Sequence, residues 1–165
     1  MTFSPRLAFV ALFVGALVAG CASEPTRIAP GTTRAEALQR LGSPTAIYPL
    51  PGGGERLQYS RLPAGFEVND VDLDASGRVV SVRQVLDERW FAQDIQDGVW
   101  READILRTYG RPFEITRVAS FDGAVWTWRY KAQNARRLLY IYVGPQGVVQ
   151  RWNTGDELYT DRLPR

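Results

Sequence analysis

The apolar and polar positions divide the chain into one long apolar run, two short helical stretches and several stretches typical of strands. The apolar run covers residues 7–20 without a charge. Ala35, Leu38 and Leu41 recur at helical spacing. Residues 78–86 alternate enough to predict a half-buried strand. The pattern therefore predicts an N-terminal apolar segment followed by a body that mixes helices and strands.

Start and stop signals delimit the first helix. Thr33 with Glu36 three residues later forms a capping box, in which each side chain satisfies a backbone N–H. Gly42 stands where a helix C-terminus favours the left-handed conformation, and Pro44 prevents continuation. We expect a helix of about two turns between them.

A second helix is expected near residues 100–109, preceded by a short helix over residues 88–95. Its apolar face is predicted to contain Trp100, Ala103, Leu106 and Tyr109. No Ser or Thr stands at the expected cap position, so we expect Asp97 or Gly98 to take that role.

Turn signals place strands after each helix. Asp122-Gly123 is a strong hairpin signal and is predicted to join a strand over 113–120 to one over 124–131. Residues 137–143 and 148–152 are separated by Gly-Pro-Gln-Gly. Helices followed by antiparallel strands predict an α+β fold, with helices packed on a sheet of three to four strands.

Two stretches of the body are similar to each other, about 70 residues apart. Residues 31–44 and 98–112 both begin G-x-x-R and both end in Gly-x-Pro. Leu57-Gln-Tyr59 matches Trp128-Arg-Tyr130, and the turn at 74–77 matches the turn at 144–147. We therefore predict two tandem units, 31–86 and 87–153, followed by a polar C-terminal tail over 154–165.

The N-terminus reads as a targeting segment. A cation at Arg6 precedes the apolar run, which is shorter than the about 20 residues of a bilayer-spanning helix. Residues 1–20 are predicted to be a signal peptide. Val18-Ala19-Gly20-Cys21 resembles the lipobox of bacterial lipoproteins, which implies that Cys21 receives a diacylglycerol and, after cleavage, an acyl chain on its amine. The alternatives are an ordinary secreted protein with a free thiol and an uncleaved anchor.

Residues 21–30 would then be the lipidated cysteine and a polar, proline-marked tether. In Gram-negative lipoproteins an Asp after the cysteine favours the inner membrane, and this chain has Ala22 there. We therefore expect the outer membrane, periplasmic face.

Composition excludes several chemistries. The chain has one cysteine and no histidine, so it cannot form an intrachain disulfide, a Ser-His-Asp site or a histidine-bearing metal site. Its net charge of +2 gives no support for binding nucleic acid. The only lysine, Lys131, lies at an expected strand end, and Glu102 and Asp104 do not face each other on a helix. We expect no catalytic residues and no cofactor.

The segment that starts at Asp72 has the D-x-D-x-S-G opening of a calcium-binding loop. Position twelve of such a loop must be Glu, and here it is Arg83. We interpret the segment as a hairpin turn with solvated aspartates and predict no metal site.

A group of aromatic residues near the C-terminus has two interpretations. Alternation places one set on a single sheet face, and two tyrosines on the next strand are expected opposite them. The group is either a partner-binding surface or the core under the helices, and we favour the core because large aromatic side chains are usually buried. The candidate partner-binding residues are Trp126, Trp128, Arg129, Tyr130, Tyr140 and Tyr142.

The helix ending L-G-x-P, the strand ending in (Trp/Leu)-x-Tyr and the following strand–turn–strand resemble the SmpA/OmlA/BamE family of small outer-membrane lipoproteins. This resemblance implies two helices against a three-stranded antiparallel sheet in each unit, and a partner in the β-barrel assembly machinery. Tandem units also resemble the fold of secreted β-lactamase inhibitor proteins. We therefore expect a non-enzymatic, lipid-anchored protein-binding or structural module, with an enzyme inhibitor or a peptidoglycan-binding lipoprotein as alternatives.

Overall fold

The computed structural model describes residues 24–158. The predicted signal peptide, Cys21 and residues 159–165 lie outside this range. The described chain is α+β, with two antiparallel four-stranded sheets and three α-helices. The α-helices are α1 (Arg34–Leu41), α2 (Glu88–Asp94) and α3 (Glu102–Tyr109), and the short 3-10 turns are η1 (Pro25–Arg27) and η2 (Pro51–Gly53). The strands are β1 (Ala46–Pro49), β2 (Glu55–Ser60), β3 (Val68–Leu73), β4 (Val79–Gln84), β5 (Glu114–Thr116), β6 (Ala124–Ala132), β7 (Ala135–Val143) and β8 (Val149–Asp156).

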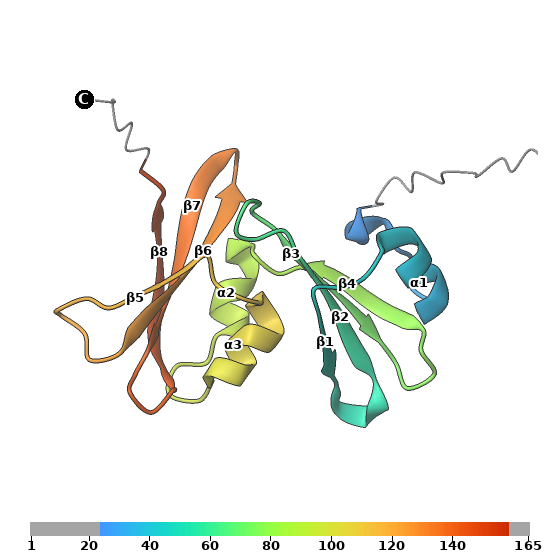
Figure 1. Ribbon diagram of the computed structural model, residues 1–165, viewed down its shortest axis with the longest axis horizontal. Helices are drawn as coiled ribbons and strands as arrows, with labels where there is room; N and C mark the ends of the chain where they lie inside the picture. Colours follow the sequence, from blue (N-terminus) through green and yellow to red (C-terminus); the bar gives the residue numbers. More distant parts are fainter. Residues whose placement is uncertain (1–23, 159–165) are drawn as a thin grey trace, which may run out of the picture.

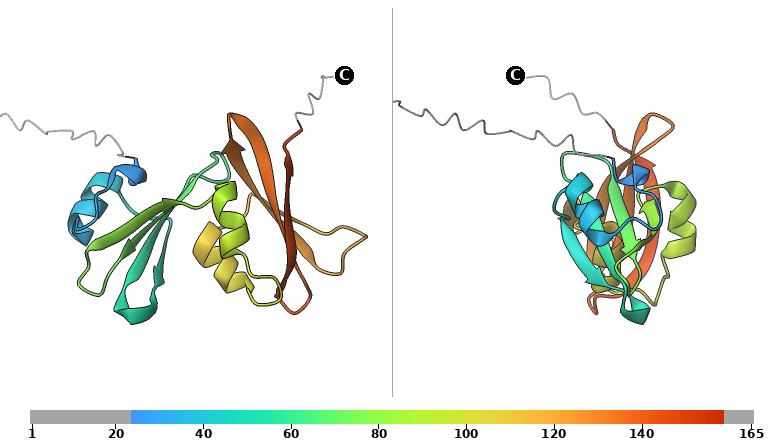
Figure 2. Two further views of the ribbon diagram at one scale, coloured as in Figure 1. Left: turned by 180° about the vertical axis from the view of Figure 1, so that it is seen from behind. Right: turned by 90° about the vertical axis from the view of Figure 1, so that its right-hand side faces the viewer.

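The elements form layers. α1 lies outside the first sheet, α2 and α3 lie between the two sheets, and the second sheet forms the other end of the molecule (Figure 1). Both sheets are simple meanders, in the order β1-β2-β3-β4 and β5-β6-β7-β8. The view from behind shows the same order of layers (Figure 2). Within residues 24–158 no helix covers the outer face of the second sheet.

The first helix begins and ends where the sequence predicts. Thr33 caps α1, and its side chain and that of Glu36 form the expected reciprocal box. The buried face is different from the prediction: Ala37 and Leu41 are buried, whereas Ala35 is exposed.

The cap of α3 corrects the sequence analysis. Neither Asp97 nor Gly98 caps this helix; its N-cap is Arg101, whose backbone N–H donates to the Asp104 carboxylate at 2.9 Å. Ile105 and Tyr109 are fully buried, while Ala103 is exposed. The predicted apolar face was therefore shifted around the helix.

Two predicted strand ranges were also wrong. β5 covers three residues instead of the expected 113–120, and residues 117–123 form the loop before β6. β8 continues to Asp156, so residues 154–156 belong to the sheet and not to a tail. β8 pairs with β7 as far as Asp156, which lies opposite Arg137, and this pairing explains the extension.

The two halves share several hydrogen bonds at corresponding places. In each half a glycine before the helix donates its backbone N–H to the carbonyl of the first residue in the last strand of the sheet. These hydrogen bonds run from Gly31 to Val79 and from Gly98 to Val149, and both measure 2.7 Å. Each third strand carries a register shift, at 72/73 and 142/143. The strand pairing, however, places Leu57 opposite Val71 and Trp126 opposite Ile141. Trp126 is therefore the counterpart of Leu57, and the predicted match of Leu57 with Trp128 is two residues off.

Two apolar cores hold the layers together. The first joins α1 to the inner residues of the first sheet, and the second joins α2 and α3 to the second sheet. Val68, Val85 and Leu86 come from the first half of the chain but pack in the second core. The two halves are thus fastened to each other by apolar contacts at the end of β3 and along the linker to α2.

Candidate functional site: an aromatic and arginine surface on the second sheet

The register of β6 with β7 separates the predicted aromatic group into two faces. Trp126 lies opposite Ile141, and Trp128 lies opposite Leu139. Tyr140 is paired with Thr127, so it points to the other side of the sheet. The prediction that Tyr140 and Tyr142 meet the tryptophans across the strands is therefore wrong.

The inner face of the second sheet is core. Trp126, Trp128 and Tyr130 are 7%, 0% and 0% exposed. The Trp128 indole N–H donates to the Tyr109 carbonyl at 3.0 Å, which fixes the sheet against α3. Burial raises the pKa of Tyr130 to about 12, and its hydroxyl donates to Glu88. These three candidates serve packing, as the core interpretation proposed.

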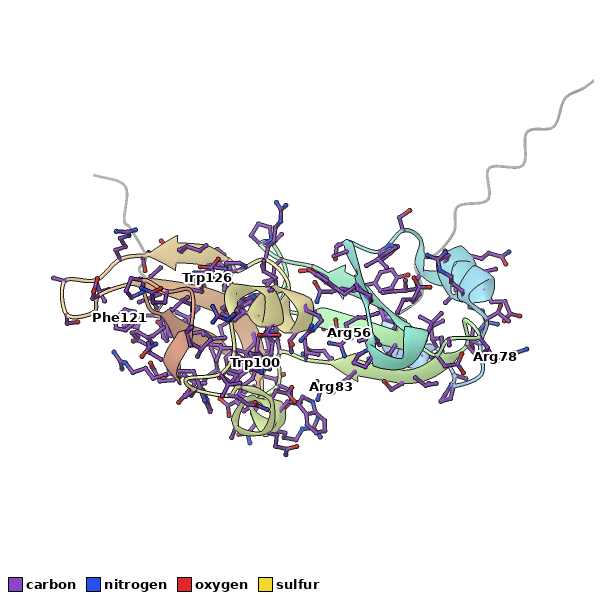
Figure 3. All side chains as sticks on the ribbon, turned by 90° about the horizontal axis from the view of Figure 1, so that it is seen from below. Arg56, Arg78, Arg83, Trp100, Phe121 and Trp126 are labelled. Carbon is purple, nitrogen blue, oxygen red and sulfur yellow. The ribbon has the colours of Figure 1, made fainter. Side chains whose placement is uncertain are left out.

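The outer face carries the other candidates. Tyr142 stacks under the Arg151 guanidinium, whose carbon lies 3.7 Å from the ring centroid. Phe121, from the loop before β6, meets Tyr142 edge-on at 5.2 Å between centroids, and Figure 3 shows it at the far end of the molecule. Burial raises the pKa of Tyr140, so its hydroxyl stays protonated near neutral pH. This face therefore presents rings that are already held in place.

Arg129 joins this face to the first half of the chain. Its guanidinium carbon lies 4.8 Å from the ring centroid of Phe66 and 5.0 Å from that of Phe113. A terminal nitrogen of Arg129 forms an ion pair with Glu157 at 2.6 Å. Phe66 comes from the loop between β2 and β3, so the surface is built by both halves.

Lys131 and Arg136 also lie over the Phe66 ring, at 5.2 and 5.4 Å from its centroid. We name the whole outer surface the aromatic–arginine face. Its residues are Phe66, Phe113, Glu114, Phe121, Thr127, Arg129, Lys131, Arg136, Leu138, Tyr140, Tyr142, Arg151, Asn153 and Glu157.

Sequence reasoning missed Phe66, Phe113 and Phe121 as members of this face. Each stands in a loop or next to a strand end, where no alternation assigns a side. The signal that pointed to the region was the density of Arg and aromatic residues from 126 to 151. The absence of a side chain at Gly155 leaves space for the Tyr140 ring, because a Cβ there would come within 3.2 Å of this ring.

A second group of polar side chains lies between the halves, on the face of the first sheet that is turned toward α3. Arg56 forms a two-pronged ion pair with Asp72 at 2.7 and 2.8 Å. Its Nη1 also lies 2.9 Å from Oδ2 of Asp70, although the angles do not make a hydrogen bond. Arg83 pairs with Asp94 of α2 at 3.0 Å. Figure 3 shows Arg56 and Arg83 at the junction of the two halves.

Asp70 is the most perturbed carboxyl of this junction. It is 2% exposed, and burial raises its pKa to about 7, against the opposing effects of Arg56 and Gln58. The Gln58 amide donates to Asp70 at 3.2 Å and to the Arg107 carbonyl of α3 at the same distance. The junction is therefore held by a polar network that includes one buried carboxyl with a raised pKa.

The aspartates of the rejected calcium loop have other partners. Asp72 forms an ion pair with Arg56, and the Asp74 carboxylate accepts hydrogen bonds from the Ser76 hydroxyl and from the backbone N–H groups of Arg78 and Ser76. These hydrogen bonds hold the pKa of Asp74 below its usual value. The interpretation of this segment as a hairpin turn is confirmed, but Asp72 is not a solvated aspartate.

In residues 24–158 no three Asp, Glu, Cys or His side chains gather closely enough to hold a metal ion. Nor does this part of the chain contain a helix that is long and apolar enough to cross a bilayer.

Comparison with known proteins adds little. No family model matches the chain, and no curated protein matches it. One similar solved structure is the crystal structure of a DUF4309 family protein, YjgB, from Bacillus subtilis subsp. subtilis str. 168. It has 13% sequence identity and a TM-score of 0.32, over 76% of this chain and 79% of that chain. A likeness at this level carries no argument about function.

Proposed function

We propose that the protein is a lipid-anchored, non-enzymatic binding module whose aromatic–arginine face docks an acidic segment of another envelope protein. The observation that carries this proposal is the outer face of the second sheet, which no helix of residues 24–158 covers. Sheets normally bury one face and expose a polar one, yet this exposed side holds tyrosine and phenylalanine rings.

The charges of the face favour an acidic partner. Among the described residues the face holds four cations, Arg129, Lys131, Arg136 and Arg151, against the carboxylates of Glu114 and Glu157. Arginine and tyrosine are the residues that most often dominate binding energy at protein interfaces. Because Arg151 and Arg129 are already stacked on rings, they lose little side-chain entropy when a partner binds.

Anchoring at Cys21 would hold the body close to the membrane. Pro25 and Ile28, which were predicted to belong to the tether, are buried in the body, so the tether after Cys21 is short. Acyl chains on Cys21 would hold the body at the outer membrane, periplasmic side. Tethering raises the effective concentration for partners in the same layer. A component of the β-barrel assembly machinery is one such partner by the family resemblance.

We further propose that the two halves are tandem copies of one unit. The paired glycine hydrogen bonds and the matched register shifts support this idea. Each copy would then be a helix followed by a four-stranded meander, with α2 added in the second. Duplication would also explain why only the second sheet is free on its outer side, because the second copy packs against the first.

Site-directed photo-crosslinking in intact cells tests the docking face. A photoreactive residue replaces Asn153, which is exposed on the edge strand β8 of the face, and a second strain carries it at Gln39, which is exposed on α1. We expect a discrete adduct from position 153 and none from position 39. Mass spectrometry should map the adduct to a partner segment rich in Asp and Glu.

Charge reversal supplies the matched control. Arg151→Glu should abolish the adduct, whereas Arg40→Glu, the same change on exposed α1, should leave it intact. Adducts that are equal at both positions, or that map to a basic segment, contradict the proposal. An adduct that survives Arg151→Glu contradicts the electrostatic part of it.

An enzyme inhibitor would use the same face, and the identity of the adduct would reveal it. A peptidoglycan-binding role is less consistent with the geometry. Sugars stack on open ring faces, and Arg151 already occupies a face of Tyr142 at 3.7 Å. Retention of the purified protein on peptidoglycan, lost on replacing Tyr142, would support the glycan alternative instead.

A further inference from the structure

A cavity of about 320 Å³ lies between the first sheet and the end of α3. Both halves of the chain line it. The first half contributes β1, β2, Thr45 before β1 and Leu62 after β2, and the second half contributes α3 and the loop that follows it. The lining residues are Thr45, Ala46, Tyr48, Gln58, Ser60, Leu62, Leu106 and Arg111.

Arg111 is the cation of this cavity, and it differs from its neighbours at the junction. Arg56 is paired with aspartates, Arg83 is paired with Asp94, and Arg107 is paired with Asp104 at 2.7 Å. Within residues 24–158 no carboxylate lies within ion-pair distance of Arg111. Its guanidinium, with five N–H donors, is therefore available to an anion from outside.

The neutral polar groups leave another donor for a ligand. The Thr45 hydroxyl donates to the Gln58 carbonyl, and the Ser60 hydroxyl accepts from the Leu62 N–H. The Tyr48 hydroxyl has no hydrogen-bond partner among the described residues, and burial raises its pKa, so it remains a donor. A ligand thus meets a guanidinium and a phenol O–H together.

The remaining wall is apolar. Leu62 and Leu106 pack against the second core, and Ala46 closes the β1 side. Ligand sites of proteins are concave and largely apolar, with few placed polar groups, and their volumes begin at about 300 Å³. This cavity combines an apolar wall with several polar lining side chains, and its volume lies at the small end of that range.

We propose that this cavity is a binding site for a carboxylate attached to a compact apolar body. The Arg111 guanidinium receives the carboxylate, the Tyr48 hydroxyl donates to it, and the apolar body contacts Leu62 and Leu106. The chemistry is that of a small apolar acid or of a peptide C-terminus with an apolar last residue. Because both halves line the cavity, an occupant would bridge them at the junction.

Titration of the purified protein with N-acetyl-leucine, followed through backbone amide chemical shifts in NMR spectra, tests the site. We expect saturable shifts at residues 45–48, 58–62 and 106–111. N-acetyl-leucine amide lacks the carboxylate charge, and acetate lacks the apolar body. Each analogue should bind at least about tenfold more weakly than N-acetyl-leucine, because it loses a charged hydrogen bond or the burial of an isobutyl group. Equal binding of either analogue overturns the proposal.

Arg111→Gln should weaken N-acetyl-leucine at least about tenfold, whereas Arg117→Gln, the same change in the exposed loop before β6, should not change it. Equal effects of the two variants would mean general attraction by positive charge and would overturn the site. Acetyl-Ala-Ala-Leu with a free carboxylate distinguishes the sources. Tighter binding than N-acetyl-leucine assigns the site to a peptide C-terminus, and weaker binding assigns it to a small acid.

Discussion

The buried carboxyl of Asp70 leads to a sharp prediction about stability and pH. Its pKa is about 7 in the folded protein and 3.8 in a free side chain. Between these values the folded protein holds a proton that the unfolded chain has released. The folded state therefore binds more protons, and the free energy of unfolding must fall as pH rises from about 4 to 7 and then level off.

The magnitude follows from the two pKa values. Each pH unit between them corresponds to about 1.4 kcal/mol. Between pH 5 and 8 the protein should lose about 3 kcal/mol, which is a decrease in Tm of roughly 6–12 °C for a chain of this size. The chain contains no histidine, so the residue type that normally titrates in this window is absent and cannot obscure the effect.

Asp70→Asn tests the assignment. Asn resembles the protonated carboxylic acid and does not titrate, so the variant should match the wild type near pH 5 and exceed it in stability at pH 8. Asp74→Asn is the control. Because the pKa of Asp74 lies below its usual value, this change should cost stability equally at pH 5 and pH 8.

Thermal unfolding followed by circular dichroism at half-unit pH steps measures both profiles. A wild-type Tm that is constant from pH 5 to 8 would refute the reasoning. So would an Asp70→Asn profile that runs parallel to the wild type. In either case Arg56, at 2.9 Å, keeps Asp70 ionised in spite of its burial.

Three further changes test the anchor and the two faces of the second sheet. Cys21→Ser should move the protein from the membrane pellet to the soluble periplasmic fraction; a pellet that retains it would remove the lipid anchor. Trp128→Ala should cost about 3–5 kcal/mol in urea unfolding and Tyr142→Ala about 1 kcal/mol, and equal losses would contradict the assignment of faces. Gly110→Ala should cost about 1–2 kcal/mol in the same assay, because its φ is +67° and the new Cβ would meet the Gln58 amide at 2.8 Å; an unchanged midpoint would show that the junction yields.

Local chemistry in the sequence was sufficient for the beginnings and ends of several elements. Thr33 and Glu36 predicted the cap of α1, and the turn at Asp74 was predicted from its Asp, Ser and Gly. The α+β class followed from the order of these elements. Such features depend on residues within a few positions of each other, so the sequence contains all the partners that decide them.

Which side chains lie on the outer face of the second sheet could not be predicted in this way. Trp126 and Trp128 alternate with Val125 and Thr127, while Tyr140 and Tyr142 alternate with Leu139 and Ile141, so both sides of both strands are partly apolar. Only the pairing of the strands decides which set meets α3.

That pairing is set by a turn of two residues. Gln133 and Asn134, both with positive φ, join Ala132 directly to Ala135, and this register places Trp128 opposite Leu139. If three residues of this same sequence formed the turn, Ala132 would pair with Arg136 and Tyr140 would lie opposite Trp128, as expected from the sequence. Because side chains alternate with a period of two, a single residue in a hairpin moves an entire strand from surface to core.

The burial of Asp70 was equally beyond the sequence. Asp70 stands in a stretch of alternating aspartates that is typical of a solvated hairpin. It is buried because α3, more than thirty residues later, covers that side of the first sheet and brings the Arg107 carbonyl against Gln58. The sequence by itself determined the cap of α1, the turn at Asp74 and the α+β class. The tertiary structure alone decided which polar and aromatic side chains are buried, because burial depends on elements that are distant in the chain.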